Sequence, residues 1–404
     1  MRNYFIIILL LFSVYFTQAQ IVNIPDANFK IALVNTNCVD LNGDGNGDAD
    51  ADTNNDGEIQ ESEAEAVSSL IVFGFDVNSV EGIQYFINLR NLNLYNNDIT
   101  DINLLQNSLL EELYIGLNQL TSLDLSNNQA LIVLKCQENQ INNLDITQNS
   151  NIVELNCWGN QLTNIDISQN LLLEKLECHI NPITNLDLSQ NLNLRELICY
   201  ATNLVSIDLN HNPELEVFDG GFNEFTELDF SQNPDLWGVF CNHSQLTSLD
   251  LSNNINLELF SAHTNQLVSL NIKNGNNINM SIMEAYNNPN LNCIEVDNVN
   301  YSNNLDCNND NWCKDITASY SENCNLGITE FNLYNVKIYP NPVEDILNVS
   351  PEFPINHIKI YTLQGQLINE TTNNHIDVSL LSSGLYFVSI MIDGKSIVKK
   401  FIKN

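Results

Sequence analysis

One unit of 21 residues recurs along the middle of the chain without a slip in register. Copies begin at residues 88, 109, 130, 151, 172, 193, 214, 235 and 256, and a degenerate tenth copy begins at residue 277. A unit this short cannot bury its own apolar face, so successive copies must stack on one another. The repeat therefore predicts a solenoid, an architecture that favours binding over catalysis.

Each copy contains two short segments in which apolar and polar residues alternate. The copy at residues 130–150 shows this alternation in segments 133–137 and 143–147. A period of two predicts half-buried strands, and no copy has room for a helix of about ten residues. We therefore expect a mostly β chain with two short strands per coil, stacked into parallel sheets, so that both long faces of the solenoid are sheet or near-extended chain.

The repeated pattern, LxxLxCxxNxLxxLDLxxN, resembles the leucine-rich repeat family, in particular its bacterial subclass with 21-residue nested repeats. The resemblance covers about half of the chain. It implies a leucine-rich repeat solenoid of about ten coils over residues 88–298.

Asparagine recurs at both turns of the coil. The first column is Asn97, Asn118, Asn139, Asn160, Asn181, Asn223 and Asn265, and the second is Asn107, Asn128, Asn149, Asn170, Asn191, Asn212, Asn233 and Asn254. An amide can donate to and accept from the backbone of adjacent coils, so both columns are interpreted as structural ladders. Thr202 and Ser244 replace the first asparagine in two copies, where we expect looser turns.

Cysteine occurs both on and off the 21-residue grid. The grid positions are Cys136, Cys157, Cys178, Cys199 and Cys241, which we interpret as free thiols that fill the core rather than a metal ladder or stacked disulfides. Residues 299–334 are expected to form a cap stapled by off-grid cysteines. Their connectivity is not readable from sequence, and our preferred pairing is Cys293 with Cys324 and Cys307 with Cys313. Cys38 has no obvious partner.

The N-terminus indicates a secreted protein, and the charge balance limits its partners. Residues 1–19 are interpreted as a signal peptide, and no later segment approaches the roughly twenty apolar residues of a transmembrane span. The formal net charge is −36, whereas residues 335–404 carry six basic and six acidic residues. A surface this acidic repels nucleic acid and anionic lipid, which leaves calcium or cationic partners plausible.

Part of the acidity forms a column in the second segment of the coils, namely Asp124, Asp145, Asp166, Asp187, Asp208, Asp229 and Asp250. Carboxylates about 5 Å apart repel unless they accept hydrogen bonds or bind cations, and we favour a solvated or hydrogen-bonded face over bound ions. Catalysis by carboxylate pairs is disfavoured, because a repetitive convex face offers no cleft.

The strongest metal signal precedes the repeats. Residues 52–63 match an EF-hand loop, with Gly57 at the sharp bend and candidate calcium ligands at Asp52, Asn54, Asp56, Glu58 and Glu63. An Asp- and Asn-rich turn is the alternative. We expect helices at residues 25–34 and 62–70 on either side, and an N-terminal cap over residues 20–87 in which calcium has a structural role.

Residues 335–404 differ in character from the repeats. Apolar runs alternate with turn signals, which predicts a small β-sandwich. The YPNP motif from Tyr339 to Pro342, the IYTLQGQ and SGLYFVSI segments and the basic end resemble the C-terminal sorting domain of the type IX (Por) secretion system. The resemblance implies a partner in that machinery and export from a Gram-negative cell, with either release or attachment to the cell surface.

Aromatic residues recur at outward positions of the first segment. The candidate ligand-binding residues are Tyr95, Tyr114, Trp158, His179, Tyr200, Phe222, Phe240, His243 and His263. Exposed rings on a rigid surface favour recognition of an extracellular protein or glycan. Alternatively, some of them, Tyr200 and Phe240 above all, only cover neighbouring strands.

Two functional hypotheses follow. The first is a secreted or surface-displayed recognition and adhesion protein, and the alternative is a calcium-binding structural component of the cell surface or extracellular matrix. No GxSxG, zinc or phosphate motif and no Cys/His dyad is present, so we do not expect an enzyme. We expect a monomer.

Overall fold

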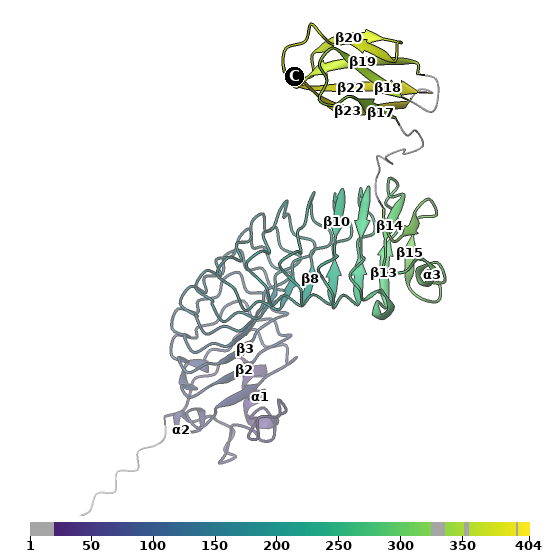
Figure 1. Cartoon of the computed structure of the whole chain (residues 1–404). Helices are drawn as coiled ribbons and strands as arrows, with labels where there is room; N and C mark the ends of the chain where they lie inside the picture. Colours follow the sequence, from purple (N-terminus) through teal and green to yellow (C-terminus); the bar gives the residue numbers. More distant parts are fainter. Residues whose placement is uncertain (1–19, 325–335, 351–354, 393–394) are drawn as a thin grey trace, which may run out of the picture. The chain divides into compact units, whose positions relative to one another are not determined.

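A computed structural model describes residues 20–324, 336–350, 355–392 and 395–404 (Figure 1). The chain forms two compact units, which divide between Cys324 and Asn325. The predicted signal peptide, residues 1–19, lies outside the described residues. Within the described ranges, no helix is both long and apolar enough to cross a membrane.

The first unit is a solenoid of stacked coils, as predicted. Its main sheet has 12 parallel strands on the inner side of an arc, and we call it the concave sheet (Figure 1). In order, its strands are β1 (Ser69–Ile71), β2 (Asn91–Asn93), β3 (Glu112–Tyr114), β4 (Val133–Lys135), β5 (Glu154–Asn156), β6 (Lys175–Glu177), β7 (Glu196–Ile198), β8 (Val217–Asp219), β9 (Gly238–Phe240), β11 (Leu259–Ser261), β13 (Ile282–Ala285) and β15 (Trp312–Lys314).

The second segment of the coil is a strand only near the C-terminal end of the solenoid. A sheet of four strands comprises β10 (Ser248–Asp250), β12 (Ser269–Asn271), β14 (Cys293–Glu295) and β16 (Ser319–Ser321). In earlier coils residues such as 143–147 form no strand, so the prediction of two strands in every coil is wrong there. Figure 1 shows the earlier coils fanning apart on the outer side of the arc, which separates neighbouring backbones, whereas the later coils run parallel.

The N-terminal cap confirms the entering helix and corrects the exiting one. Helix α1 (Ala27–Asn35) is capped by Asp26, whose carboxylate accepts the N–H groups of Asn28 and Phe29. The exiting helix α2 spans only Glu61–Ala64, and residues 69–71 form β1 instead of continuing it. Leu70 is buried in the first rung beside Leu92, and this tertiary packing prevails over local helix propensity. Val39 pairs antiparallel with Leu70 and covers the edge of the concave sheet.

The C-terminal end of the solenoid contributes further rungs. Strands β15 and β16 pair with β13 and β14, so both sheets continue past residue 298, and the concave sheet also begins before residue 88. The short helices η1 (Ile83–Tyr85), η2 (Asn277–Asn279) and α3 (Val299–Ser302) lie in connecting segments. The disulfides Cys293–Cys324 and Cys307–Cys313 confirm the preferred pairing.

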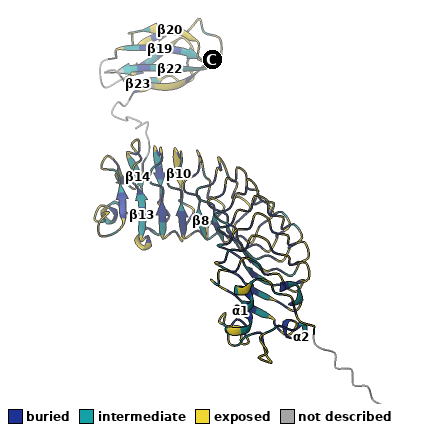
Figure 2. Ribbon diagram, turned by 180° about the vertical axis from the view of Figure 1, so that it is seen from behind, coloured by how far each residue is buried: buried dark blue, intermediate teal, exposed yellow. Residues whose placement is uncertain are grey.

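The core of the solenoid is one continuous cluster of buried apolar residues that runs through all of its coils. Figure 2 marks buried residues in dark blue along the strands. Cysteines 136, 157, 178, 199 and 241 are buried and free, which confirms their interpretation as core fillers. Burial raises the pKa of the Cys136 and Cys178 thiols to about 12. These thiols therefore remain protonated and unreactive at neutral pH. Cys38 is also buried and free.

The first asparagine column satisfies the backbone of one turn. In a representative coil, the amide of Asn139 donates to the carbonyls of Ile115 (3.0 Å) and Cys136 (3.1 Å) and accepts the N–H of Leu120 (2.9 Å). One side chain thus joins two adjacent coils. Where Thr202 replaces asparagine, its hydroxyl lies 3.1 Å from the carbonyl of Cys199 and 2.7 Å from Oδ1 of Asn223 and has a single proton to donate.

The second asparagine column only donates. The amide of Asn128 bonds the carbonyls of Leu104 (3.1 Å) and Asn107 (2.8 Å), and each later member repeats the contact with the asparagine before it. The Oδ1 atom of Asn128 is buried without a hydrogen-bond partner, and so are the Oδ1 atoms of the other seven asparagines in this column. Carbonyl groups of the turns are therefore satisfied at the cost of unpaired amide oxygens.

The second unit consists of two antiparallel sheets around its own core. One has the order β17 (Lys337–Tyr339), β18 (Ile346–Ser350) and β21 (His375–Asp377), and the other the order β20 (Leu367–Thr371), β19 (His357–Thr362), β22 (Gly384–Ile392) and β23 (Lys395–Lys403). Leu347, Ile360, Val388 and Phe401 are among the buried residues that pack together. The predicted small C-terminal β unit is confirmed.

The substitution Asn139→Ala should lower the free energy of unfolding of the solenoid by about 1–3 kcal/mol, because it leaves the buried N–H of Leu120 without its acceptor. It also removes one of the two amide donors of the Ile115 and Cys136 carbonyls, which keep Asn118 and Asn160 as partners. Denaturation followed by tryptophan fluorescence measures the change, since all three tryptophans lie in the solenoid unit. Gln140→Ala, at an exposed neighbouring position, is the control. An equal midpoint for both variants would contradict the ladder's role.

Candidate ligand-binding face

The concave sheet presents three columns of outward side chains. In the strands from β1 to β13, the first and third residues form two columns, because the second residue is buried in the core. A third column, two residues beyond each strand, carries most of the predicted aromatic residues. Successive members of a column lie on neighbouring coils, so their side chains can stack along the solenoid.

Three predicted residues form one continuous ring stack, which we call stack 1. The rings of Trp158 and His179 lie 5.1 Å apart at 11°, and those of His179 and Tyr200 lie 4.3 Å apart at 23°. His179 is buried between its neighbours, and desolvation lowers its pKa. The imidazole is therefore neutral at physiological pH and contributes to the stack as an aromatic ring.

A second stack continues nearer the C-terminal end and is called stack 2. Phe222 stacks on His243 at 4.1 Å, His243 meets His263 edge-on at 4.9 Å, and His263 stacks on Tyr286 at 4.5 Å. Desolvation also lowers the pKa of His263. Phe222 remains 53% exposed, so stack 2 offers apolar surface to a ligand.

The other three predicted residues lie outside these stacks. Tyr95 stacks on Phe73 at 5.7 Å near the N-terminal cap. Tyr114 donates to Glu112 at 2.8 Å and lies beneath the ammonium group of Lys135. Phe240 is half-buried in the sheet itself, beside Gly238.

Sequence reasoning missed Phe73 and Tyr286, although both occupy the third column. The rungs β1 to β2 and β11 to β13 are 22 and 23 residues apart, so these two residues fall off the 21-residue grid. It also missed Ile198, Val217, Leu259 and Ile282, which are half-buried on the concave sheet. The sequence could have indicated them, because each is an apolar residue at the first or third position of its strand, which faces outward.

One carboxylate on the concave sheet takes part in no ion pair within the part of the chain that the structure describes, and it accepts a hydrogen bond only from the backbone. Asp219, the last residue of β8, is half-buried, and its pKa is raised by burial, although a hydrogen bond from the N–H of Gly221 acts in the opposite direction. The other acids at outward strand positions have side-chain partners. Glu154, for example, pairs with Lys135 (2.9 Å), whereas Glu112 and Glu284 lack a cation within the described ranges and accept the hydroxyls of Tyr114 (2.8 Å) and Ser261 (2.9 Å). Among the described residues, no Lys, Arg or His lies within 4.0 Å of the Asp219 carboxylate.

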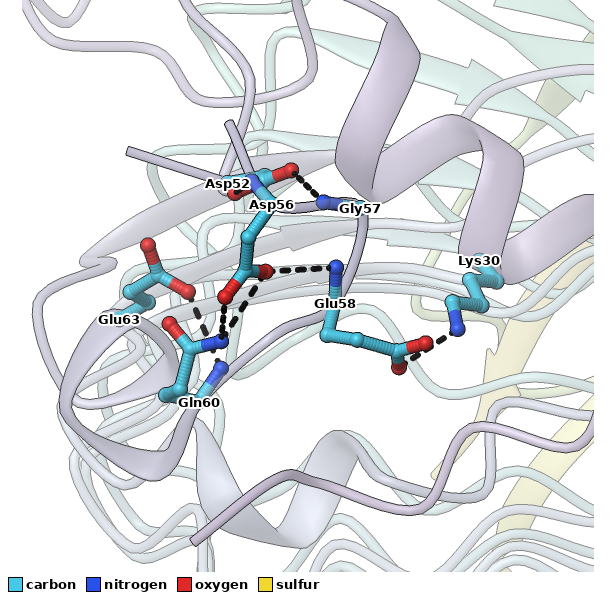
Figure 3. A network of polar contacts seen from close by, with 7 residues as sticks. All are labelled: Lys30, Asp52, Asp56, Gly57, Glu58, Gln60 and Glu63. Carbon is cyan, nitrogen blue, oxygen red and sulfur yellow. Dashed lines mark hydrogen bonds and ion pairs between the residues drawn. The ribbon is translucent and has the colours of Figure 1, made fainter. Parts of the chain in front are cut away.

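The predicted calcium loop lies in the N-terminal cap (Figure 3). The Asp52 carboxylate accepts the N–H groups of Asp56 (3.2 Å) and Gly57 (2.8 Å), and Gly57 has a φ of +81°. The Glu63 carboxylate folds back to accept the N–H of Asn54 at 3.1 Å. Asp52 and Glu63 are both buried, so the first and last predicted ligands close the loop.

Two side chains alter the expected ligand set. Nε2 of Gln60 donates to both carboxylate oxygens of Asp56, at 3.2 and 3.0 Å, and the Glu58 carboxylate is turned away in an ion pair with Lys30 at 2.6 Å (Figure 3). Among the described residues, no three His, Cys, Asp or Glu side chains are grouped as metal ligands. The loop has the acidic residues and the bend that calcium requires, but the Gln60 amide must leave Asp56 for an ion to bind there.

The aspartate column of the outer side is a hydrogen-bonded face, as expected. Asp124, Asp145 and Asp166 each accept the N–H two residues ahead at 3.0 Å. Hydrogen bonds lower the pKa of all three carboxyls. The largest contribution at Asp124 is from the backbone of Ser126. At Asp145 it is from the side chain of Thr147, and at Asp166 from the side chain of Ser168. These hydrogen bonds offset part of the repulsion between neighbouring carboxylates.

Comparison with known proteins identifies the two parts of the chain. Residues 337–404 match the secretion system C-terminal sorting domain. The solenoid is similar to an internalin (inlF) from Listeria monocytogenes, with a TM-score of 0.52 and 21% identity over 70% of this chain and 87% of that chain. The chain has a leucine-rich repeat fold followed by a type IX sorting domain. The sorting domain directs this leucine-rich repeat protein to the cell surface or the extracellular space.

Two further structures are similar in part. The functional domain of InlJ from Listeria monocytogenes, which includes a cysteine ladder, has a TM-score of 0.41 and 21% identity over 86% of this chain and 93% of that chain. The leucine-rich repeat domain of APL1B has a TM-score of 0.49 and 16% identity over 64% and 84%. No curated protein matches the leucine-rich repeat protein by sequence.

The substitution Asp219→Asn should stabilise the protein at neutral pH. The pKa of Asp219 is raised in the folded state, so ionisation of the carboxyl opposes folding above that pKa. The extra stability of the variant should shrink as the pH falls through the raised pKa. It should vanish below the ordinary value of 3.8, where the carboxyl is protonated in both the folded and the unfolded state. Denaturant midpoints across this pH range measure it. A variant less stable than the wild type at neutral pH would contradict the assignment.

Proposed function

We propose that the exported solenoid is a recognition and adhesion protein that binds an extracellular protein or glycan on its concave side. The observation that carries the proposal is stack 1, where Trp158, His179 and Tyr200 form a continuous ring surface across three coils. Ring stacks are rigid before a ligand arrives, so binding costs little side-chain entropy. Tyrosine and tryptophan also dominate the binding energy of many interfaces.

Stack 2 extends the proposed contact surface. Phe222 and His243 are exposed, and Tyr286 ends the stack on the last coils. The sorting domain supports the same proposal, because export brings this face into contact with molecules outside the cell. No motif of an enzyme active site accompanies the stacks, so we propose binding without catalysis.

Replacing Trp158 and Tyr200 together with alanine should weaken ligand binding by about 30-fold or more, because each is a large aromatic contact. Arrays of glycans and extracellular proteins, probed with the mature chain, first identify a ligand, and surface plasmon resonance then measures its affinity. The control is Leu192→Ala, at an exposed apolar residue of the opposite turn. Equal affinity of the double variant and the control would refute the proposed face.

We also propose that the loop at residues 52–63 binds calcium in a structural role. Such an ion is compatible with the recognition function. It would serve equally in the alternative, a calcium-binding structural component of the cell surface or extracellular matrix. The supporting observation is the burial of the Asp52 and Glu63 carboxylates, which accept only hydrogen bonds and have no cationic partner among the described residues. A bound ion would hold the cap against the first rung of the solenoid.

Calcium should raise the stability of the wild type, by about 2.7 kcal/mol at one hundred times its Kd. The variant Glu63→Gln should lose this gain, because it removes the last carboxylate of the loop. Calorimetric titration with calcium and melting curves with and without chelator give the measurement, and Glu65→Gln, at an exposed neighbour, is the control. Identical melting of the wild type in calcium and in chelator would exclude the site.

A further inference from the structure

The concave sheet divides into two halves of different chemistry. From β3 to β7 its outward positions are mostly charged, whereas from Ile198 onward they are mostly apolar. We define the apolar patch by its members on strands β7, β8, β9, β11 and β13, which are Ile198, Val217, Phe240, Leu259 and Ile282. All five side chains are partly accessible to solvent.

The register makes the patch contiguous. Val217, Gly238, Leu259 and Ile282 follow one another on four neighbouring strands. A Cβ at Gly238 would lie 3.5 Å from the Phe240 ring and 3.7 Å from the methyl groups of Val217. Gly238 itself is buried, because the Phe240 ring and the Val217 methyl groups lie beside the position that its side chain would take.

Asp219 is the one acid at an outward strand position between Ile198 and Leu259. Its register partners on either side are Ile198 and Phe240, about 5 Å away by strand spacing. The negative charge of Asp219 raises the pKa of three neighbouring groups, which are Tyr200, Cys199 and Cys241. None of these groups is a cation. A carboxylate in an apolar surface without a counter-ion is poorly solvated, and this destabilises the protein in the absence of a ligand.

The charged half offers no comparable site, because its groups already satisfy one another. Lys175 bridges Glu177 (2.9 Å) and Glu196 (3.2 Å), and Lys135 pairs with Glu154 (2.9 Å). A ligand that docked there would have to break these pairs. Covering the apolar patch, in contrast, breaks no ion pair, and the Asp219 carboxylate gains a partner if the ligand supplies a cation. The other acid at an outward position of these strands, Glu284 on β13, already accepts the hydroxyl of Ser261 at 2.9 Å.

We propose that the apolar patch is the centre of the docking surface and that it takes a protein segment in which a lysine or arginine is flanked by apolar side chains. The cationic group pairs with the Asp219 carboxylate, while its apolar neighbours cover Ile198, Val217 and Phe240. Stacks 1 and 2 border the segment. This inference rests on the proposed recognition function and specifies the ligand class as protein.

Selection of phage-displayed random peptides on the immobilised mature chain tests the proposal without a known ligand. We expect enrichment of peptides that carry lysine or arginine beside apolar residues. A synthetic enriched peptide should bind Asp219→Asn at least about 30-fold more weakly than the wild type, because its cation would be buried without a partner. Asp187→Asn, which removes an exposed carboxylate of the outer side, should bind like the wild type.

The outcomes separate this inference from the proposed function. Peptides that need Trp158 and Tyr200 but bind Asp219→Asn normally would overturn the basic-residue inference and leave concave recognition standing. If the chain binds only glycans in the array experiment, the inference of a protein ligand would be overturned, whereas recognition on the concave side would still stand. Binding that neither the Asp219 nor the double aromatic variant weakens would overturn both. Unchanged circular dichroism and tryptophan emission of Asp219→Asn establish that any loss of binding is local.

Discussion

The solenoid depends on the pairing of backbone polar groups at its tight turns. A coil of 21 residues reverses direction twice, and each reversal leaves carbonyl and N–H groups that the sheets do not use. The asparagine amides supply the missing partners and join each coil to the one before it, as Asn139 does with Ile115. This pairing fixes the path of every coil, keeps the strands in register and frees the outward positions from a structural role.

That freedom is what allows a binding surface. The inward positions are restricted to residues that fill the core, such as Leu134 and Cys136, whereas the outward positions vary from coil to coil. On the concave sheet this variation produces paired charges in one half and apolar side chains around Asp219 in the other. The surface is held by hydrogen bonds and core packing beneath it, so its rings and its carboxylate are positioned before any ligand binds.

The repetitive features of the fold follow directly from the sequence. The period predicts the solenoid, the asparagine columns and the free core thiols, because each depends only on which residue type recurs at one position. The features set by tertiary geometry do not follow. The curvature of the arc removes the second strand from the early coils, and packing of Leu70 ends the predicted exiting helix.

The candidate site was predictable in part for the same reason. Aromatic residues at outward positions were identifiable, but their division into two stacks depends on side-chain conformations that no pattern encodes. Phe222 and His243 lie at a turn position with φ near +55°, a conformation unusual for residues other than glycine, asparagine or aspartate. This turn directs them toward stack 2. The apolar patch escaped notice because isoleucine, leucine and valine on a strand are expected in a core.

The identical pairing of successive rungs also bears on how such proteins change in length. Leu113 pairs with Leu134 as Leu134 pairs with Leu155, so excision of one whole coil would rejoin surfaces that already match. Each excision or duplication between the cap and stack 1 would shift the two ring stacks and the Asp219 carboxylate relative to the cap by one strand spacing, about 4.8 Å. Evolution can thus adjust the distance between contact points in fixed steps, without altering the chemistry of any of them.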